Sequence, residues 1–328
     1  MSTSTATWIE KADQQVADLS AGGLMQPELQ ATFYRVMFKK SKILSLLQNK
    51  QMSSHTFEID NVLPDEVILQ PGTESTVLPT AARSKLQFGK AILTNVELVG
   101  EVEWSYQTVE DNIEKGTFDQ LVVSSIGERV AANVEDIVIS GDTTITIPAM
   151  GATAASILAW KRARMRKTFN GINAKITSRT VDAAGSRLNK NVLKAALQTM
   201  PEEFTTDGLR FFTNRNAVSD FHDSKANRQT PGGDKAFEES GDTSFQGWPV
   251  VQIPQWPRTL GANSNMTTVA LFDPKSAYVG FHRQITLERD RQVRARKYIA
   301  VWSMRVGFQF AYEPGTLLIT NVRADADI

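Results

Sequence analysis

The stretch of sequence that decides the fold runs from Asp111 to Gly141: DNIEKGTFDQLVVSSIGERVAANVEDIVISG. Its apolar residues recur three or four positions apart, on one stripe of a 3.6-residue helix: Phe118, Leu121, Val122, Ile126, Val130, Val134, Ile137 and Val138. The pattern predicts a helix from Thr117 to Ser140, about 36 Å long at 1.5 Å per residue. Thr117 or Asp119 can cap its start, and we expect Gly141 to end it in a left-handed conformation. Strand-like sequence flanks this helix on both sides, so we expect it to lie across strands.

Composition limits what else the chain can be. Its 328 residues suffice for two domains or one large one. Lys plus Arg and Asp plus Glu number 36 each, so no overall charge draws the chain to nucleic acid or to a membrane. The absence of cysteine excludes disulfides, thiolate nucleophiles and cysteine-rich zinc sites. No apolar run reaches membrane-spanning length, and the first residues resemble no secretory signal, so we expect no membrane partner.

Ahead of the long helix, the sequence predicts a projecting β-ribbon. Extended chain begins near His55, a turn follows at 70–73, and the chain returns from Lys85 to Tyr106 with alternating polar residues. The tip between the two arms has nothing with which to build a core. Because a two-stranded ribbon is marginally stable alone, we expect it to lie on a neighbouring molecule.

After the long helix, the pattern predicts a mixed αβ segment. Helices are expected at 154–169, 189–200 and 215–224, with short buried strands at 209–213 and in the sequences WPVVQIP and TTVALFDP. The first of these helices carries five basic residues between Lys161 and Lys167. Its composition favours a solvated helix face over a nucleic-acid contact.

The last sixty residues predict a long hairpin. Strands are expected at 284–291 and 298–312, followed by a final strand at 317–322 and an acidic tail. The connection between the first two strands is strongly basic. We call the following residues the tip cluster: Arg289, Arg291, Arg294, Arg296 and Lys297.

Evidence for catalysis is thin. The three histidines, His55, His222 and His282, are scattered and lack metal-ligand spacing. No nucleophile-elbow, dinucleotide-binding or phosphate-loop motif occurs. The carboxylate pair Glu135 and Asp136 is better explained as a polar helix face, or as a contact with a cation on a neighbouring chain, than as an acid/base couple. We therefore expect no enzyme activity, no cofactor and no metal.

The order of these parts resembles the Hong Kong 97-type major capsid protein of tailed bacteriophages. An arm, an extended ribbon, a long helix ending in ANVEDIVISGD, an αβ domain and a long hairpin follow one another across almost the whole chain. The close of the helix at 134–142 resembles the family's "ED … nGd" pattern. The run Phe212-Thr213-Asn214, with FQGWPV at 245–250 further on, resembles its "mn … l.G.pv" pattern.

The resemblance implies an α+β fold of the Hong Kong 97 type. Residues 1–50 would be the N-terminal arm, and 51–105 the extended loop with its return strand. A peripheral domain with a spine helix would comprise 106–142 and 284–312. An axial αβ domain, clustered around five-fold and six-fold axes, would comprise 143–283 and 313–328.

Two departures from the family's features change what can be expected. Some relatives begin with a long scaffolding segment, whereas barely twenty residues here stand before the amphipathic part of the arm, so scaffolding is expected from another chain. Some relatives also join subunits by a Lys–Asn isopeptide bond. Lys85 and Lys90 stand on the extended loop, but no Asn occurs between Gln284 and Gln309, which argues against that crosslink.

The implied function is a shell protein that assembles with itself into hexamers and pentamers around packaged double-stranded DNA. Portal and separate scaffolding or decoration proteins are expected partners, and DNA contact is expected to be weak and non-specific. The protein would reside in the virion after assembly in the host cytoplasm. The tip cluster should meet carboxylates of neighbouring chains. The candidate intersubunit contacts, besides the tip cluster, are Glu74, Arg83, Lys85, Glu110, Asp111 and Glu114.

Two alternatives stay open on the sequence alone. An encapsulin, which is a bacterial cargo compartment of the same fold, would assemble in the same way. Neighbouring cargo genes, against portal and terminase genes, would distinguish it from a phage capsid. A soluble αβ enzyme with no recognised motif is the third class, and a monomeric chain would favour it.

Overall fold

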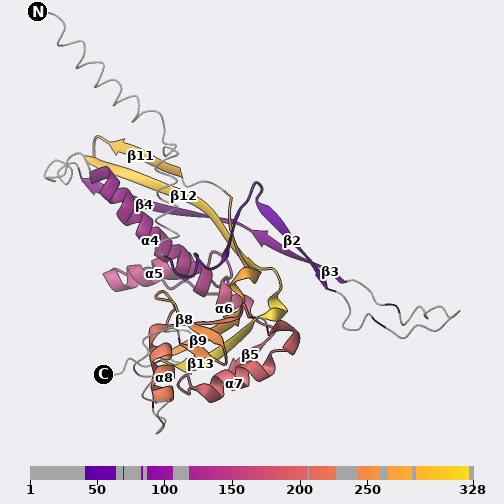
Figure 1. The fold of residues 1–328 in the computed structure, drawn as a ribbon. Coiled ribbons are helices and arrows are strands. Elements are labelled where there is room, and N and C mark those ends of the chain that lie inside the picture. The colour runs from indigo at the N-terminus through magenta and orange to yellow at the C-terminus, as the bar shows by residue number, and fades with distance from the viewer. Residues whose placement is uncertain are drawn as a thin grey trace, which may run out of the picture.

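The computed structural model describes residues 41–63, 69, 83, 87–105, 118–205, 207–226, 243–258, 265–282 and 286–324. The described strands form two β-sheets and a two-stranded ribbon. A long helix, α4 (Phe118–Ser140), packs against the first sheet (Figure 1). None of the helices in these ranges is long and apolar enough to cross a membrane.

Helix α4 confirms the predicted helix from residue 118 onward, while residues 111–117 lie outside the described ranges. Its second half is the buried part, where Val134, Ile137 and Val138 are at most 1% exposed. Val130 is only partly buried and packs against the edge of the same core. The apolar stripe therefore drives packing mainly near the C-terminal end of the helix.

Gly141 ends α4 for a reason other than the expected one. The expected left-handed conformation is wrong, because among the described glycines only Gly185 and Gly247 have positive φ. A Cβ on Gly141 would instead lie 2.2 Å from the carbonyl oxygen of Phe169. The chain crosses itself here, and the amide of Gly171 donates to the carbonyl of Gly141 at 2.8 Å. Only a residue without a side chain permits this close approach.

The first sheet has the order β1-β10-β12-β11, with β4 pairing along the free side of β12. Its strands are β1 (Gln48–Gln51), β4 (Val96–Ser105), β10 (Ala277–Phe281), β11 (Thr286–Gln292) and β12 (Lys297–Phe310). The central strand β12 alternates as predicted, because Trp302, Met304 and Val306 are buried while the residues between them are half-buried. These three side chains share a core cluster with Val134 and Ile137 of α4, so this face of the sheet is the one that α4 covers.

The predicted return strand from Lys85 to Tyr106 is broken in two at Asn95. Strand β3 (Gln87–Thr94) pairs with β2 (Thr56–Leu63) in the ribbon, whereas β4 pairs with β12 in the first sheet. Asn95 is fully buried, and its Oδ1 lies 2.8 Å from the Nδ1 of His55. One continuous sequence pattern therefore serves two different sheets.

The second sheet has the order β5-β13-β9-β6-β8-β7 and contains both parallel and antiparallel pairs, as predicted for a mixed αβ segment. Its strands are β5 (Thr180–Asp182), β6 (Arg210–Thr213), β7 (Ser244–Phe245), β8 (Trp248–Gln252), β9 (Met266–Phe272) and β13 (Leu317–Arg323). Helices α7 (Lys190–Thr199) and α8 (Arg215–Ala226) cover it, with short helical turns at η2 (Glu202–Phe204), η3 (Pro274–Ser276) and η4 (Glu313–Gly315).

Strand β10 joins the two halves of the structure. It follows β9 after one short turn, yet it pairs with β12 in the first sheet, with Val279 opposite Phe308. The resemblance assigned these residues to the axial domain, whereas their hydrogen bonds run to the sheet of the long hairpin. The proposed domain limits thus remain a prediction, and this strand is shared at the junction.

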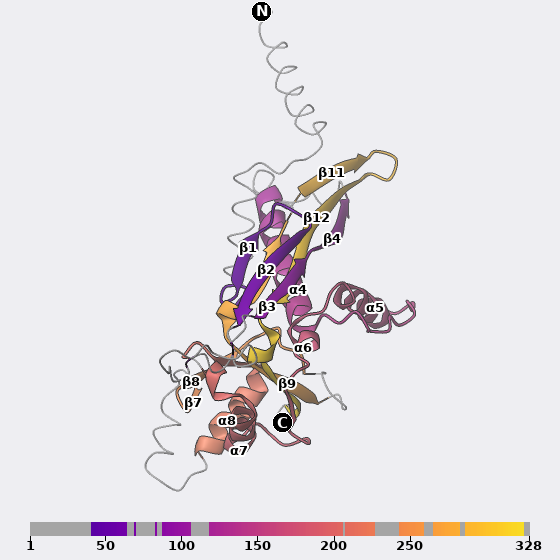
Figure 2. The ribbon, with the colours of Figure 1, turned by 90° about the vertical axis from the view of Figure 1, so that its right-hand side faces the viewer.

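Helix α5 (Ala154–Arg166) is attached near the end of α4 and stands away from both sheets (Figure 2). It is followed by the short helix α6 (Ile172–Lys175). The predicted helix at 154–169 is confirmed, three residues shorter at its end. None of its side chains is buried, which sets it apart from α4 and α7.

Candidate assembly surfaces

Large apolar side chains are exposed in four regions of the described chain. The ribbon and its extension contribute Leu69, Phe88 and Ile92, and strand β4 contributes Val99 and Val102. The segment at α5 contributes Ile147, Met150 and Leu158, and the hairpin turn contributes Val293. Contiguous exposed apolar surface on a soluble chain marks contact sites.

The ribbon has one packed face and one bare face. Ile59 and Leu93 are buried beside Met52, whereas Phe88 and Ile92 on the other face are 75% and 54% exposed. On the bare face the Nζ of Lys90 reaches Glu58 at 2.7 Å. This ion pair is itself exposed, so it contributes little to the fold. An apolar face of this kind suits contact with another protein surface.

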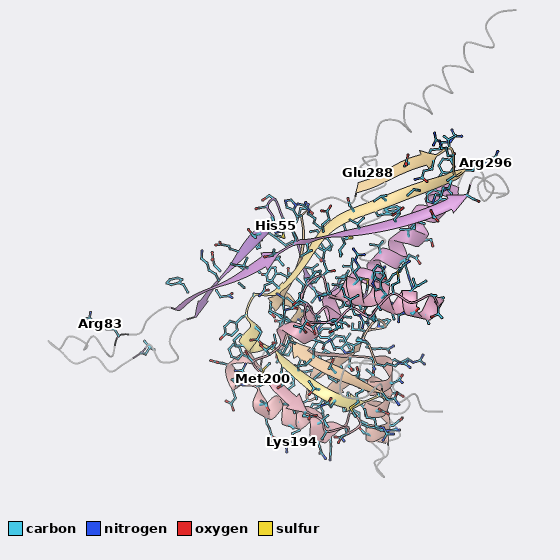
Figure 3. The ribbon with its side chains drawn as sticks, turned by 180° about the vertical axis from the view of Figure 1, so that it is seen from behind. His55, Arg83, Lys194, Met200, Glu288 and Arg296 are labelled. Carbon is cyan, nitrogen blue, oxygen red and sulfur yellow. The ribbon has the colours of Figure 1, made fainter. Side chains whose placement is uncertain are left out.

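The candidate contacts on the ribbon are only partly placed. Arg83 is exposed and lies well away from both sheets (Figure 3). Glu74 and Lys85 lie outside the described residues, and so do Glu110, Asp111 and Glu114 beyond β4. Their expected contacts with the tip cluster therefore remain predictions.

The tip cluster sits on the hairpin of β11 and β12, at the far end of the first sheet (Figure 3). Arg291, Arg294 and Arg296 are exposed, and Arg296 closes the turn with φ of +47°. Arg289 is placed by its backbone, opposite Ala300. Lys297 differs from the rest, because its Nζ pairs with Glu103 of β4 in the same chain.

Alternation along the three neighbouring strands collects carboxylates on the face of the first sheet that α4 leaves uncovered. Glu288 lies opposite Val301, and Glu101 flanks Val301 from the other side. Residues directly opposite one another share a face. The following residues, which we call the acidic face, lie on it: Glu97, Glu101, Glu103, Glu288 and Asp290.

The acidic face adds four glutamates to Asp290, the only acid within the run 289–297 that holds the tip cluster. Two cations of β12 share this face, and both are already paired within the chain, Lys297 with Glu103 and Arg305 with Glu97. The alternation of acids in 97–103 was a visible signal. It was missed because that segment was assigned to the ribbon.

The carboxylate pair on α4 has two separate partners within the chain. Asp136 accepts from the Nε and Nη2 of Arg166 at 3.1 and 2.8 Å. Glu135 is 3% exposed and accepts from the backbone N–H of Ile43 at 3.1 Å. The expectation of a polar face or of a contact with a neighbouring chain is therefore wrong for both residues. They fix α5 and the segment at 41–47 to the spine helix.

Two ionisable groups are perturbed by burial. Burial raises the pKa of Glu135, and hydrogen bonds from Ile43 and Ser41 oppose that shift in part. Burial also lowers the pKa of Lys175 to about 8, and its Nζ donates to the side chain of Gln309. Neither group faces a second titratable group in a way that would support acid/base catalysis.

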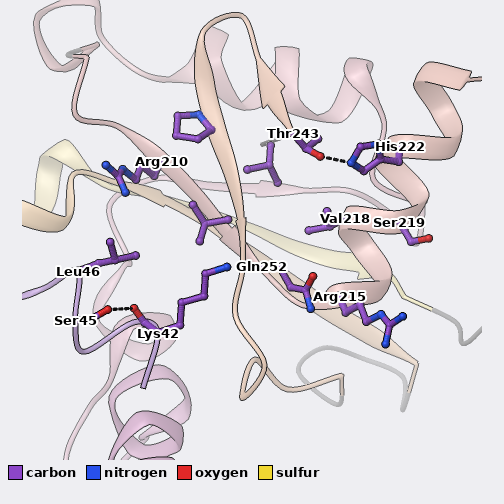
Figure 4. Close-up of a pocket in the computed structure, with 13 residues that line it drawn as sticks. Lys42, Ser45, Leu46, Arg210, Arg215, Val218, Ser219, His222, Thr243 and Gln252 are labelled. Atoms are coloured by element: carbon purple, nitrogen blue, oxygen red, sulfur yellow. Dashed lines mark hydrogen bonds between the residues drawn. The ribbon is translucent and has the colours of Figure 1, made fainter. Parts of the chain in front are cut away.

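An open cleft of about 810 Å³ lies between the segment at 42–46 and the second sheet (Figure 4). Lys42, Arg210, Arg215 and His222 line it, and no carboxylate is among its lining residues. The hydroxyl of Thr243 hydrogen-bonds the Nε2 of His222. This contact places a hydroxyl beside an imidazole, but no carboxylate among the lining residues is available to orient that imidazole. No group of three metal-ligating side chains occurs in the described ranges. The elements of the cleft are far apart in sequence, so sequence reasoning could not assemble it.

The fold is that of the Hong Kong 97-type capsid proteins. A chain of the satellite phage P4 procapsid including size determination (Sid) protein superposes with a TM-score of 0.62 at 11% identity, covering 98% of both chains. A chain of the structure of Mycobacterium phage Cain superposes with a TM-score of 0.55 at 16% identity, covering 88% of this chain and 91% of its own length. The holo-SrpI encapsulin of Synechococcus elongatus PCC 7942 superposes with a TM-score of 0.54 at 10% identity, covering 87% of this chain and 89% of the encapsulin chain.

The sequence assigns the family within that fold. The profile of the phage capsid family matches residues 21–320, so the chain belongs to this family. The putative prophage capsid protein YqbE of Bacillus subtilis (strain 168) is 28% identical over 321 residues, covering 96% of this chain and 98% of the relative. The chain is a phage major capsid protein, and the resemblance seen in its sequence is confirmed.

Proposed function

We propose that this capsid protein assembles with itself into hexamers and pentamers that close an icosahedral shell around double-stranded DNA. The observation that carries the proposal is the ribbon, whose bare face exposes Phe88 and Ile92 at 75% and 54%. A monomer gains nothing from such a face, whereas a second copy lying against it would bury it. At about 25 cal/mol per Å², burying two such side chains contributes a few kcal/mol per interface.

Repetition makes such modest contacts sufficient. A heterologous contact that is repeated by symmetry holds each subunit through several neighbours at once. The tip cluster offers a second contact, because its exposed arginines Arg294 and Arg296 have no ion pair within the described residues. Arginine suits this role, since its planar fork binds a carboxylate through two hydrogen bonds.

The proposed role is structural rather than catalytic, and the protein would act in the virion after assembly in the host cytoplasm. Portal, scaffolding and decoration proteins are proposed as partners on the resemblance alone. Contact with packaged DNA is proposed to be weak, because the chain has no net charge.

An encapsulin compartment is the second candidate, because an encapsulin shares the fold over 87% of this chain. The family match and the relative YqbE favour the phage capsid. Size-exclusion chromatography and negative-stain microscopy of the recombinant chain test assembly: closed shells support it, and a stable monomer at high concentration contradicts it. Virions of the source phage, opened and analysed for protein, should contain this chain as their most abundant component.

A further inference from the structure

Positive charge is concentrated in one segment of this neutral chain. Between Asp142 and Asp182 the sequence contains seven Lys or Arg and no Asp or Glu. The cations are Lys161, Arg162, Arg164, Arg166, Lys167, Lys175 and Arg179. In the whole chain acids and bases are equally frequent, at 36 each, so this segment departs sharply from the average.

The structure presents most of these cations on α5, which is held firmly at one end and bare along its length. Arg166 is bound to Asp136 on α4, and the carbonyl of Arg166 accepts from the amide of Asp142 at 2.9 Å. Thr153 caps the other end by accepting from the amide of Ser156. No side chain of α5 is buried, so the helix is oriented by its terminus and remains open to solvent (Figure 2).

The exposed cations of α5 are not neutralised by the chain itself. Lys161, Arg162 and Lys167 are exposed and make no ion pair in the parts of the chain that the structure describes. Arg164 lies over the ring of Trp160, 5.2 Å from its centroid. Lys161 and Arg164, and likewise Arg164 and Lys167, are three residues apart, a spacing at which like charges repel. The helix dipole favours cations only in the last turn, so it does not account for Lys161 and Arg162.

The acidic face lies on the other side of the same sheet. Helix α4 covers the face of the first sheet that carries Trp302 and Met304, and α5 is attached to α4 through Asp136. Glu101, Glu288 and the rest of the acidic face project from the opposite side. The basic helix α5 is therefore attached on the side of the first sheet that α4 covers, and the acidic face lies on the other side of that sheet.

A shell one subunit thick turns one of these sides toward its contents. Duplex DNA carries one negative charge per about 1.7 Å of axis, so an inward acidic face would repel it while an inward basic helix would attract it. We propose that α5 lines the inside of the shell and binds the phosphate backbone of the enclosed duplex through Lys161, Arg162, Arg164 and Lys167. The acidic face then lies outside. This inference rests on the proposed assembly of the chain around DNA.

A second copy of the chain fits α5 less well than DNA does. The acidic face is the cluster of carboxylates that the described strands gather, and like-oriented subunits in one layer present it on the opposite shell surface. The helix is about 20 Å long and offers four cations, so each subunit contacts only a few phosphates. Such contacts are weak singly and independent of base sequence, which suits DNA that must enter and leave.

Sidedness is tested by labelling, because the natural chain has no cysteine. Shells of Ala159→Cys and of Glu101→Cys are treated with a small maleimide and with a maleimide attached to a protein too large to enter. We expect Ala159→Cys to react with the small reagent only, and Glu101→Cys to react with both. Reaction of Ala159→Cys with the large reagent overturns the proposal, and so does its protection from both, since a neighbour then covers α5. Microscopy of the same samples separates these results from a failure to form shells.

DNA contact is tested on the soluble subunit with a labelled duplex. The variant Lys161→Gln/Arg162→Gln/Lys167→Gln should bind at least tenfold more weakly at low salt, and the slope of log affinity against log salt should fall by about 2–3. The matched control, Lys190→Gln/Lys194→Gln/Lys275→Gln, removes the same charge from exposed positions on other elements. Equal slopes for the two triple variants would show that α5 has no special role, whether or not shells form.

Discussion

The backbone N–H of Ile43 donates to the Oε1 of Glu135 across a distance of 3.1 Å and 92 positions of sequence. The side chain of Ser41 and the backbone of Lys42 also hydrogen-bond this carboxylate. A buried carboxylate on the spine helix thus anchors the start of the described chain. Its partners are neutral donors, so the hydrogen bonds rather than an ion pair hold it.

Glu135→Ala should lower the free energy of unfolding by about 1–3 kcal/mol, because the N–H of Ile43 then loses its acceptor in a buried site. Glu135→Gln keeps an acceptor and removes the buried charge, so it should match or exceed the natural chain at pH 7. Urea unfolding of the subunit measures both. A loss in Glu135→Gln as large as in Glu135→Ala would contradict this account.

The pH dependence of unfolding, compared between the natural chain and Glu135→Gln, tests the direction of the pKa shift of Glu135. Burial raises the pKa of Glu135 in the folded chain, so the folded state holds this proton more tightly than the unfolded state. The contribution of Glu135 to stability is therefore most favourable below its unfolded pKa, about 4.3, and is lost as pH rises through its folded pKa. The advantage of Glu135→Gln should grow between about pH 4 and pH 7. An advantage that stays constant over this range would show that the charge is not the cause.

Gly141→Ala should destabilise the subunit by at least about 1–3 kcal/mol, since its Cβ would lie 2.2 Å from the carbonyl oxygen of Phe169. Gly100→Ala is the matched control. It lies in β4, where an added Cβ meets nothing within 4 Å, and should change the melting temperature little. Comparable melting temperatures for the two variants would mean that the crossing at Gly141 tolerates a side chain.

Arg166→Ala should cost about 1–3 kcal/mol in unfolding free energy, because it leaves the carboxylate of Asp136 largely buried without its two donors. Arg164→Ala removes an exposed cation from the same helix and should cost about 0.5 kcal/mol or less. A double-mutant cycle with Asp136→Asn measures the coupling. Additive effects would show that the pair does not hold α5 in place.

Phe88→Ser/Ile92→Ser should leave the melting temperature of the subunit unchanged within error and weaken shell formation, because both side chains are exposed in the monomer. Leu93 is fully buried on the other face of the same strand, so Leu93→Ser should destabilise the subunit instead. Light scattering during assembly separates the two effects. Normal shells from the double variant would remove the ribbon's bare face from the interface.

Arg294→Glu/Arg296→Glu should leave the circular dichroism of the subunit intact and block assembly, because both side chains are exposed at the hairpin turn. High salt should loosen shells of the natural chain for the same reason. Lys297→Glu is a different case, since Lys297 already pairs with Glu103 within the chain. Normal assembly of the double variant would identify the turn as a solvated loop.

The local pattern of the sequence predicted the elements that it alone controls. Spacing of apolar residues at three and four predicted α4, and alternation predicted the buried face of β12, because each periodicity records which side of one element is packed. The mixed αβ segment follows from the same rule. The order of these elements was enough to indicate the capsid fold.

Tertiary structure decided which partner each residue meets. No local pattern shows that Asn95 divides one extended run between two sheets, that Gly141 is crossed by the chain at 169–171, or that Glu135 receives the amide of Ile43. The acidic face likewise exists only because β4 and β11 pair on either side of β12. These contacts join residues far apart in sequence, and their geometry follows from packing of the whole chain rather than from the conformational preference of any segment.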